Sequence, residues 1–146
     1  MSPKGLRHEV VKTALADRWH RLPHDDCGLA VATTFRLSED TYLESDAVIY
    51  PRATDLKELT GANALLVVEI ADSSLRYDMG RKAALYASFG VRELWVIDAA
   101  KLTTRVFRAP SPSGYGETRD FGASERLVPL FAPDAFALRL EELDLS

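Results

Sequence analysis

The chain has little of the features that mark several specialised protein classes. Its single cysteine among 146 residues, Cys27, excludes an internal disulfide framework and suits a reducing, cytoplasmic location. No apolar run approaches the ~20 residues that span a bilayer, and the N-terminal stretch MSPKGLRHEVVK lacks an apolar signal core. Basic residues are outnumbered, and the formal net charge of −4 argues against a general polyanion binder, although local patches can still attract nucleic acid. We therefore expect a cytoplasmic protein without a membrane partner.

Several common catalytic motifs are also missing. The sequence contains no P-loop, GxGxxG, GxSxG, HExxH or CxxC pattern, so the enzyme classes that use them have no support. What remains is the composition of a globular protein, 47% hydrophobic and 27% charged, with no repeats, low-complexity tracts or linkers. A chain of this length fits one domain, and we expect residues 1–146 to form one.

The hydrophobic pattern predicts a mixture of strands and helices. A helical stripe of apolar residues at three- and four-residue spacings covers the first segment, and later segments alternate or form short continuous apolar runs. In chain order we expect a helix over Arg7–Leu22, strands over Leu29–Leu37 and Tyr42–Tyr50, a polar connection with one helical turn over 52–63, a strand over Leu65–Val68, a helix ending at Gly90, strands over Leu94–Ile97 and Leu102–Arg108, a loop over Pro110–Gly116, a strand or hairpin arm over Phe121–Pro129, and a strand with a closing turn over Leu130–Ser146.

Two acidic residues adjoin apolar strands. Glu69 ends the run Leu65–Val68, whose continuous apolar character indicates a strand buried on both faces, and Asp46 precedes Ala47-Val48-Ile49. A carboxylate at the rim of a core needs a cation, a hydrogen-bond donor or a metal beside it. The alternative is that Glu69 lies just beyond the core and is solvated.

The helix after Glu69 carries a possible partner. Asp78, Lys82 and Tyr86 recur every four residues and therefore share one helical face. The alternative for Asp78 and Lys82 is an exposed ion pair worth under ~1 kcal/mol. The segment Asp72-Ser73-Ser74 can cap the helix. Positive charges outnumber negative ones between positions 75 and 92, which makes this stretch locally basic.

These residue types suit metal-dependent hydrolysis. Two carboxylates on adjacent strand ends, here Asp46 and Glu69, can hold Mg²⁺, which prefers oxygen ligands and keeps several waters. Such a cation stabilises charge developing on a phosphodiester, and a lysine such as Lys82 can orient the water or pair with the phosphate. His8, at the start of the first helix, can ligate metal or contact phosphate, or can be a solvated first-turn histidine. His20 and His24 form no metal pair, because Pro23 breaks the helix between them.

At these residues the sequence resembles the Uma2 (Uma-two) family of restriction endonucleases, within the PD-(D/E)XK nuclease superfamily. The resemblance is strongest over Leu65–Asp98 and traceable from about His8 to Leu145. It rests on a strand aspartate, a strand glutamate, a serine-rich turn, a helix start with arginine and aspartate, a helix lysine and tyrosine, and a Gly-Val-x-Glu-x-Trp-x-x-Asp strand. These correspond to Asp46, Glu69, Ser73 and Ser74, Arg76 and Asp78, Lys82, Tyr86, and Gly90, Val91, Glu93, Trp95 and Asp98.

The resemblance implies a restriction-endonuclease-like core of the α/β (α+β) class, a mixed β-sheet flanked by helices. It implies Asp46 and Glu69 as Mg²⁺ ligands, with Mn²⁺ as a substitute, and the backbone carbonyl of Ile70 as a third ligand. The superfamily's usual lysine, two residues after the glutamate, is Ala71 here. Lys82, reaching in from the next helix, is the implied replacement.

Two departures accompany the resemblance. Ser45 stands where the family has proline, which alters the local turn but not the ligand. The family's N-terminal hairpin, which often supplies an acidic residue, is expected to be absent before the first helix, and Glu9 is its only evident substitute. Loss of that hairpin would weaken metal binding or inactivate the site, and a dimer partner could cover the sheet edge so exposed.

Three hypotheses therefore stay open. The first is a Mg²⁺-dependent DNA endonuclease, expected to act as a homodimer if both strands of a duplex are cut. The second is a catalytically degenerate nuclease fold that binds nucleic acid or protein, and the third is a scaffold in which the acidic residues form an internal ion-pair cluster. For the first, supporting roles are expected of Asp78, Tyr86, His8 and Glu9. Phosphate contacts are expected of Arg76, Arg81 and Arg92, each of which can instead be an ordinary solvated charge.

Overall fold

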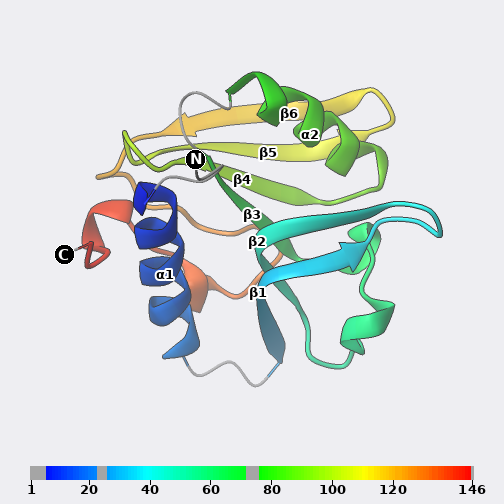
Figure 1. The fold of residues 1–146 in the computed structure, drawn as a ribbon, viewed down its shortest axis with the longest axis horizontal. Coiled ribbons are helices and arrows are strands. Elements are labelled where there is room, and N and C mark those ends of the chain that lie inside the picture. Colours follow the sequence, from blue (N-terminus) through cyan, green and yellow to red (C-terminus); the bar gives the residue numbers. More distant parts are fainter. Residues whose placement is uncertain (1–5, 23–25, 72–75, 146) are drawn as a thin grey trace.

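A computed structural model describes residues 6–22, 26–71 and 76–145 of the chain. Within these residues it contains two α-helices, one six-stranded sheet and short 3₁₀ turns (Figure 1). The elements are α1 (Leu6–His20), β1 (Cys27–Arg36), β2 (Tyr42–Pro51), η1 (Leu56–Glu58), η2 (Gly61–Asn63), β3 (Leu66–Ala71), α2 (Arg76–Ser88), β4 (Glu93–Asp98), β5 (Thr103–Ser111), β6 (Gly114–Phe121), η4 (Asp134–Phe136) and η5 (Leu140–Glu142).

The sheet is mixed, and its strands follow one another in chain order from β1 to β6. Neighbouring strands are antiparallel except for β3 and β4, which run parallel because α2 crosses between them. The predicted α+β class with a mixed sheet flanked by helices is therefore confirmed. The sheet is strongly twisted, so β1 and β6 point in different directions across the molecule (Figure 1).

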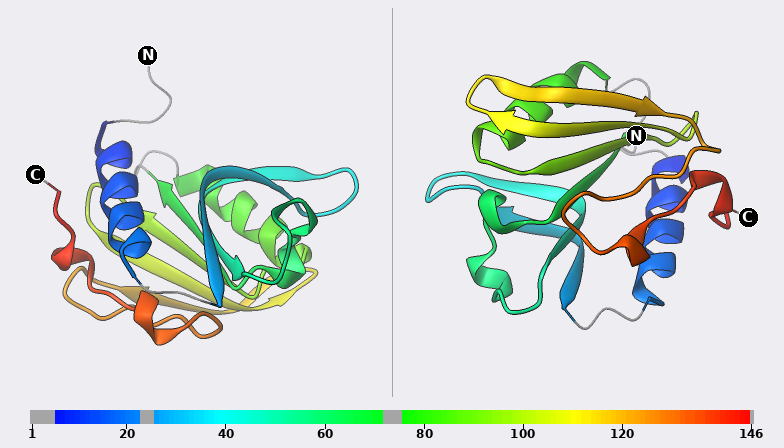
Figure 2. Two further views of the ribbon diagram at one scale, coloured as in Figure 1. Left: turned by 90° about the horizontal axis from the view of Figure 1, so that it is seen from below. Right: turned by 180° about the vertical axis from the view of Figure 1, so that it is seen from behind.

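Each face of the sheet has its own hydrophobic core. Successive residues of β3 alternate between the two, with Val68 and Ile70 in the core that contains α1 residues and Val67 in the core that contains α2 residues. Figure 2 shows α1 and the C-terminal segment on one side of the sheet and α2 on the other. By the same alternation Glu69 projects toward α2.

The helix α1 packs through residues at positions 8, 11, 15 and 19. Val11, Leu15 and Trp19 are the apolar members of this buried stripe, and His8 continues it by one turn toward the helix start. The indole Nε1 of Trp19 donates to the Phe136 carbonyl oxygen at 3.1 Å, and the two rings meet edge to face. The helix therefore connects the sheet to the C-terminal segment.

Three expectations for the second half of the chain are wrong. The loop expected over Pro110–Gly116 is the end of β5 and the start of β6, joined by a short turn, and β6 ends at Phe121, where the sequence predicted a strand to begin. The sixth strand is an exposed edge with few apolar residues, so it has no hydrophobic alternation to detect. The strand expected after Leu130 is instead two 3₁₀ turns and one isolated bridge between Leu127 and Leu138.

No helix in the described part of the chain is long and apolar enough to cross a membrane.

Candidate functional site

The two predicted carboxylates lie where β2 and β3 separate. The ladder between these strands includes the pair Ala47 and Val68, and continuing its register by one residue places Asp46 opposite Glu69. Instead of a further backbone pair, the Asp46 carboxylate Oδ2 accepts a hydrogen bond of 2.7 Å from the backbone N–H of Ile70. Asp46 and Glu69 are each 4% exposed, so both acids belong to the interior and the solvated alternative for Glu69 is wrong.

Helix α2 supplies the partners of Glu69. The Lys82 ammonium lies 3.1 Å from Glu69 Oε1, and the Tyr86 hydroxyl donates to Glu69 Oε2 at 2.5 Å. The spacing of four residues puts both donors on one face of the helix, as the sequence predicts. The expected approach of Lys82 to Glu69 is therefore confirmed, whereas its role in catalysis stays a prediction.

Burial shifts the pKa values of two side chains at the site, Glu69 and Tyr86. Burial raises the pKa of the Glu69 carboxyl above its ordinary value, and the nearby Asp46 charge acts in the same direction, although Lys82 and Tyr86 oppose it. Burial, together with the Glu69 charge, raises the pKa of Tyr86 far above that of a free phenol. Tyr86 therefore stays protonated at neutral pH and remains a donor to Glu69.

Helix α1 contributes a histidine on the other side of Asp46. His8 is 2% exposed, so the alternative of a solvated first-turn histidine is wrong. Its Nε2 lies 3.2 Å from Asp46 Oδ1, and its Nδ1 lies 3.1 Å from Glu9 Oε2. Glu9 also pairs with Lys12 at 3.1 Å and is about half exposed. The signal in the sequence is that His8 lies three residues before Val11, on the same helical stripe.

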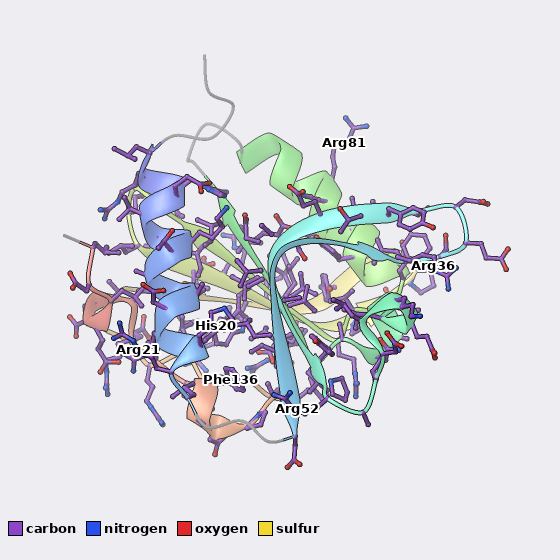
Figure 3. All side chains as sticks on the ribbon, turned by 60° about the horizontal axis from the view of Figure 1, so that its bottom comes forward. His20, Arg21, Arg36, Arg52, Arg81 and Phe136 are labelled. Carbon is purple, nitrogen blue, oxygen red and sulfur yellow. The ribbon has the colours of Figure 1, made fainter. Side chains whose placement is uncertain are left out.

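Of the predicted phosphate-binding arginines, the two whose side chains the structure describes, Arg81 and Arg92, are not gathered around the acids. Arg81 is exposed on α2 and extends away from the body of the protein in Figure 3. Arg92 precedes β4 and stacks on Phe131, with 5.1 Å between the guanidinium and the ring centre. Val96 is the β4 residue that pairs with Glu69, so Arg92 lies about 13 Å away along the strand, at ~3.3 Å per residue.

The structure does not test every expected residue. The side chains of Arg76 and Asp78, like the whole of the expected cap Asp72-Ser73-Ser74, lie outside the described residues.

One arginine that the sequence analysis passed over lies at the site. Arg7 precedes His8, and its Nε donates to the backbone carbonyl of Ala99 at 2.8 Å. The Ala99 amide in turn donates to the Ala71 carbonyl at 2.9 Å, two residues beyond Glu69. The exposed guanidinium is thus anchored beside the ends of β3 and β4. Nothing in the local sequence identifies it, because its partner is a backbone atom 92 residues away.

A cavity of about 590 Å³ adjoins the site. Ala71, Gly80 and Val96 line it, and Val96 is the β4 residue that pairs with Glu69, whereas β5 and β6 form the far wall. The charged residues that line the cavity are Asp98, Lys101, Arg105, Asp120 and Glu125. Acidic side chains outnumber basic ones there, and Arg105 already pairs with Asp120 at 2.7 Å, so the charge of this cavity does not favour a phosphate backbone.

The donor set at the point where β2 and β3 separate fits a hard divalent cation. No three histidine, cysteine, aspartate or glutamate side chains of the described residues form a ready-made metal cage. Mg²⁺ does not require one, because it keeps several waters and binds through one or two carboxylates plus substrate phosphates. Asp46 and Glu69 supply these carboxylates. The carbonyl of Ile70 points to the same side as its N–H, hence toward Asp46, so it is a suitable third oxygen.

The model of the Uma2 family, described as "Putative restriction endonuclease", matches residues 1–141. The chain belongs to this family. Among solved structures, it is similar to a protein from Anabaena variabilis described as a "putative nuclease belonging to DUF820", with a TM-score of 0.67 and 15% identity over 97% of this chain and 82% of that one. That likeness, at such low identity, supports the fold alone. No curated protein matches the chain.

Membership of the Uma2 family places the buried acids in the context of a nuclease. The residues that carried the sequence resemblance, Asp46, Glu69, Lys82 and Tyr86, are those that the structure brings together. The chain is therefore a nuclease-family protein with an α+β fold and a cluster of two acids, a lysine and a tyrosine at the point where β2 and β3 separate.

Proposed function

We propose that this Uma2 member is a Mg²⁺-dependent endonuclease that hydrolyses DNA phosphodiester bonds. The observation that carries the proposal is the meeting of Glu69 with Lys82 beside Asp46, although these residues come from β3, α2 and β2. Glu69 and Asp46 are too buried to serve as ordinary surface charges. Two carboxylates can hold Mg²⁺, and a lysine beside them can pair with a phosphate oxygen as a point charge.

In this proposal Asp46, Glu69 and the Ile70 carbonyl hold Mg²⁺. When bound, the ion supplies positive charge to the phosphate in the transition state and lowers the pKa of the attacking water. The Ile70 amide keeps the Asp46 carboxylate in one orientation. Because Lys82 and Tyr86 occupy the two oxygens of Glu69, loading the site requires Glu69 to share one of them.

The roles proposed for Lys82 and Tyr86 follow from their positions. Lys82 is about one-third exposed, so its ammonium can reach a phosphate oxygen or a water without leaving the neighbourhood of Glu69. Tyr86 is fully buried and, as a permanent donor, holds Glu69 in place. Lys82 is thus the candidate for contact with the reacting atoms, and Tyr86 is a positioning residue.

DNA and a second copy of the chain are the proposed partners. Arg7, anchored at the strand ends, is the best-placed described arginine for a phosphate contact, with Arg81 farther out on α2. A homodimer is proposed because one site cuts one strand at a time. Cleavage of both strands by paired sites predicts that linear plasmid appears with higher-order dependence on protein concentration.

Nicking of supercoiled plasmid tests the proposal. We expect metal-dependent relaxation by the full chain, and a loss of about 100-fold or more in Glu69→Gln and Lys82→Ala, since each removes a group that acts on the transition state. Glu117→Gln on the exposed edge strand β6 and Lys57→Ala on η1 are charge-matched controls that should retain full activity. Circular dichroism confirms that each variant is folded.

The same experiment separates the alternatives. Metal-dependent nicking that persists in Glu69→Gln would contradict the proposed site. DNA binding that weakens steeply with salt, without cleavage by the parent protein, would instead identify a binding module. The observation that favours that second reading is the occupation of both Glu69 oxygens by protein donors.

A further inference from the structure

The contact between α1 and β2 is chemically unusual. His8 is almost fully buried, with Nδ1 3.1 Å from Glu9 Oε2 and Nε2 3.2 Å from Asp46 Oδ1. The first contact is a hydrogen bond, whereas Nε2 is a buried atom without a hydrogen-bond partner, because its approach to Asp46 is not aligned for one. One imidazole therefore stands between two carboxylates and satisfies only one of them.

The hydrogen bond to Glu9 favours the tautomer of His8 that carries its proton on Nδ1. A neutral imidazole carries its proton on one nitrogen, and a carboxylate beside Nδ1 places it there. The lone pair of Nε2 then faces an oxygen of Asp46 at 3.2 Å, so that two acceptors meet inside the protein. Such a contact is unfavourable unless a positive charge is shared between the two atoms.

A metal ion satisfies this contact better than a shared proton. The misalignment of Nε2 disfavours a linear N–H···O bond, whereas two ligands about 3 Å apart can both lie near 2.1 Å from one ion. Metal-binding histidines commonly donate their second ring nitrogen to a carboxylate, which fixes the tautomer, as Glu9 does here. The histidine and the carboxylate that fixes its tautomer, His8 and Glu9, are adjacent residues in the first turn of α1.

We propose that His8 Nε2 and Asp46 Oδ1 together bind a first-row transition-metal dication, so that the site prefers Mn²⁺-class ions to Mg²⁺. The inference rests on the proposed function, because the ion proposed here and the proposed catalytic metal share Asp46 as a ligand. It narrows the class of metal ion that this site binds. A nitrogen donor is a poor ligand for Mg²⁺ but an ordinary one for the transition metals.

Manganese binding to the full chain, prepared without a histidine tag, tests the proposal. Titration with Mn²⁺ alone and with Mg²⁺ alone gives the two affinities, and pulsed electron paramagnetic resonance detects ¹⁴N coupling from a bound imidazole. We expect Mn²⁺ to bind about tenfold or more tightly than Mg²⁺, with ¹⁴N coupling. In His8→Gln the coupling disappears and the Mn²⁺ affinity falls about tenfold or more, while the Mg²⁺ affinity changes far less.

Two further variants keep the test decisive even if the buried His8→Gln change impairs folding. The chain has three histidines, and His20→Gln/His24→Gln leaves His8 as the only possible imidazole ligand. His20 is exposed at the last residue of α1, about 18 Å from His8 at 1.5 Å per residue, and lies far down the helix in Figure 3. Nitrogen coupling retained in this double variant supports His8. Glu9→Gln should keep the coupling and weaken Mn²⁺ binding.

The outcomes separate this inference from the proposed nuclease activity. Absence of ¹⁴N coupling in the parent protein, or its loss in His20→Gln/His24→Gln, overturns the inference. If Mg²⁺-dependent nicking is seen without nitrogen coupling, the proposed function stands and the inference fails. If nitrogen coupling is seen without nicking in either metal, the metal site stands and the proposed function fails.

Discussion

Two buried glutamates on neighbouring strands have opposite surroundings. Glu93, at the start of β4, is 0% exposed and accepts from the Trp95 indole, from both Nε and Nη2 of Arg108 and from the Leu130 backbone N–H. Glu69, near the end of β3, accepts from one lysine and one tyrosine and faces a second acid. The first carboxylate is saturated with fixed donors, and the second is not.

The difference separates a structural role from a functional one. Arg108 also donates to the Val128 carbonyl, so the Glu93 cluster joins β4, β5 and the C-terminal segment into one unit. A rigid, planar guanidinium suits this fixed, two-pronged contact. Glu69 instead pairs with the flexible ammonium of Lys82, which is partly exposed. A carboxylate that keeps exchangeable partners at an opening is the one able to bind a ligand.

The largest expected effect comes from Glu93→Ala. The change removes the counter-ion of the partly buried Arg108 and leaves the Trp95 indole and the Leu130 backbone N–H without their acceptor, so we expect the unfolding free energy to fall by about 3–5 kcal/mol. Urea unfolding followed by tryptophan fluorescence measures it. Glu117→Ala on the exposed strand β6 is the matched control and should change stability by less than about 0.5 kcal/mol. A loss below about 1 kcal/mol in Glu93→Ala would remove the contrast.

The second-largest effect is expected at Glu69, whose ionisation makes the stability of the protein depend on pH. Burial raises the pKa of Glu69 in the folded protein above its usual 4.5, so the folded state binds this proton more tightly than the unfolded state. The contribution of Glu69 is therefore greatest below pH 4.5 and is lost as the pH rises through the raised value. In Glu69→Gln that decline should vanish, with a difference in slope of at most about 1.4 kcal/mol per pH unit.

Unfolding in urea at a series of pH values from 4.5 upward makes this measurement, with the parent protein and Glu69→Gln side by side. The variant should gain stability relative to the parent as the pH rises. Curves that stay parallel over the whole range would mean that Lys82 and Tyr86 compensate the burial of Glu69 completely, and the two glutamates would then be alike.

The smallest effect on stability is expected for the exposed ion pair between Arg105 and Asp120, which extends the comparison of the two glutamates to the protein surface. Arg105 and Asp120 meet through two hydrogen bonds, of 2.7 and 3.1 Å, on β5 and β6, yet both side chains are more than half exposed. Water and salt screen such pairs, so a double-mutant cycle of Arg105→Ala and Asp120→Ala should give a coupling below about 1 kcal/mol. A coupling above about 2 kcal/mol would show that geometry outweighs burial in this protein.

Sequence reasoning succeeded where one short stretch contains all the interacting parts. The predicted strand at Leu65–Val68, the helix ending at Gly90 and the strand at Leu94–Ile97 correspond to β3, α2 and β4. Gly90 has a positive φ of 80°, as expected of a residue that ends a helix. The contact of Lys82 and Tyr86 with Glu69 is part of the same stretch, because helical spacing fixes which side chains share a face.

Sequence reasoning failed where a residue's partner is distant along the chain or where an element is exposed to solvent. The strand β6 (Gly114–Phe121) has almost no buried residue, so nothing in its composition marks it as a strand. His8 was read from its position at a helix start, where most histidines are solvated, and its partner Asp46 is 38 positions away. The different surroundings of Glu69 and Glu93 were equally hidden, since Arg108 and Leu130 approach from later parts of the chain.

The sequence by itself determined the mixture of strands and helices and the two acids that adjoin the apolar runs of β2 and β3, because periodicity and apolar runs are local properties. Only the tertiary structure decided that a histidine from the first helix touches Asp46, that Arg7 is anchored at the same strand ends, and that Glu93 is held by fixed donors. Those contacts depend on how segments distant in sequence pack across the twisted sheet. The spacing of residues within one segment does not predict how distant segments pack against each other.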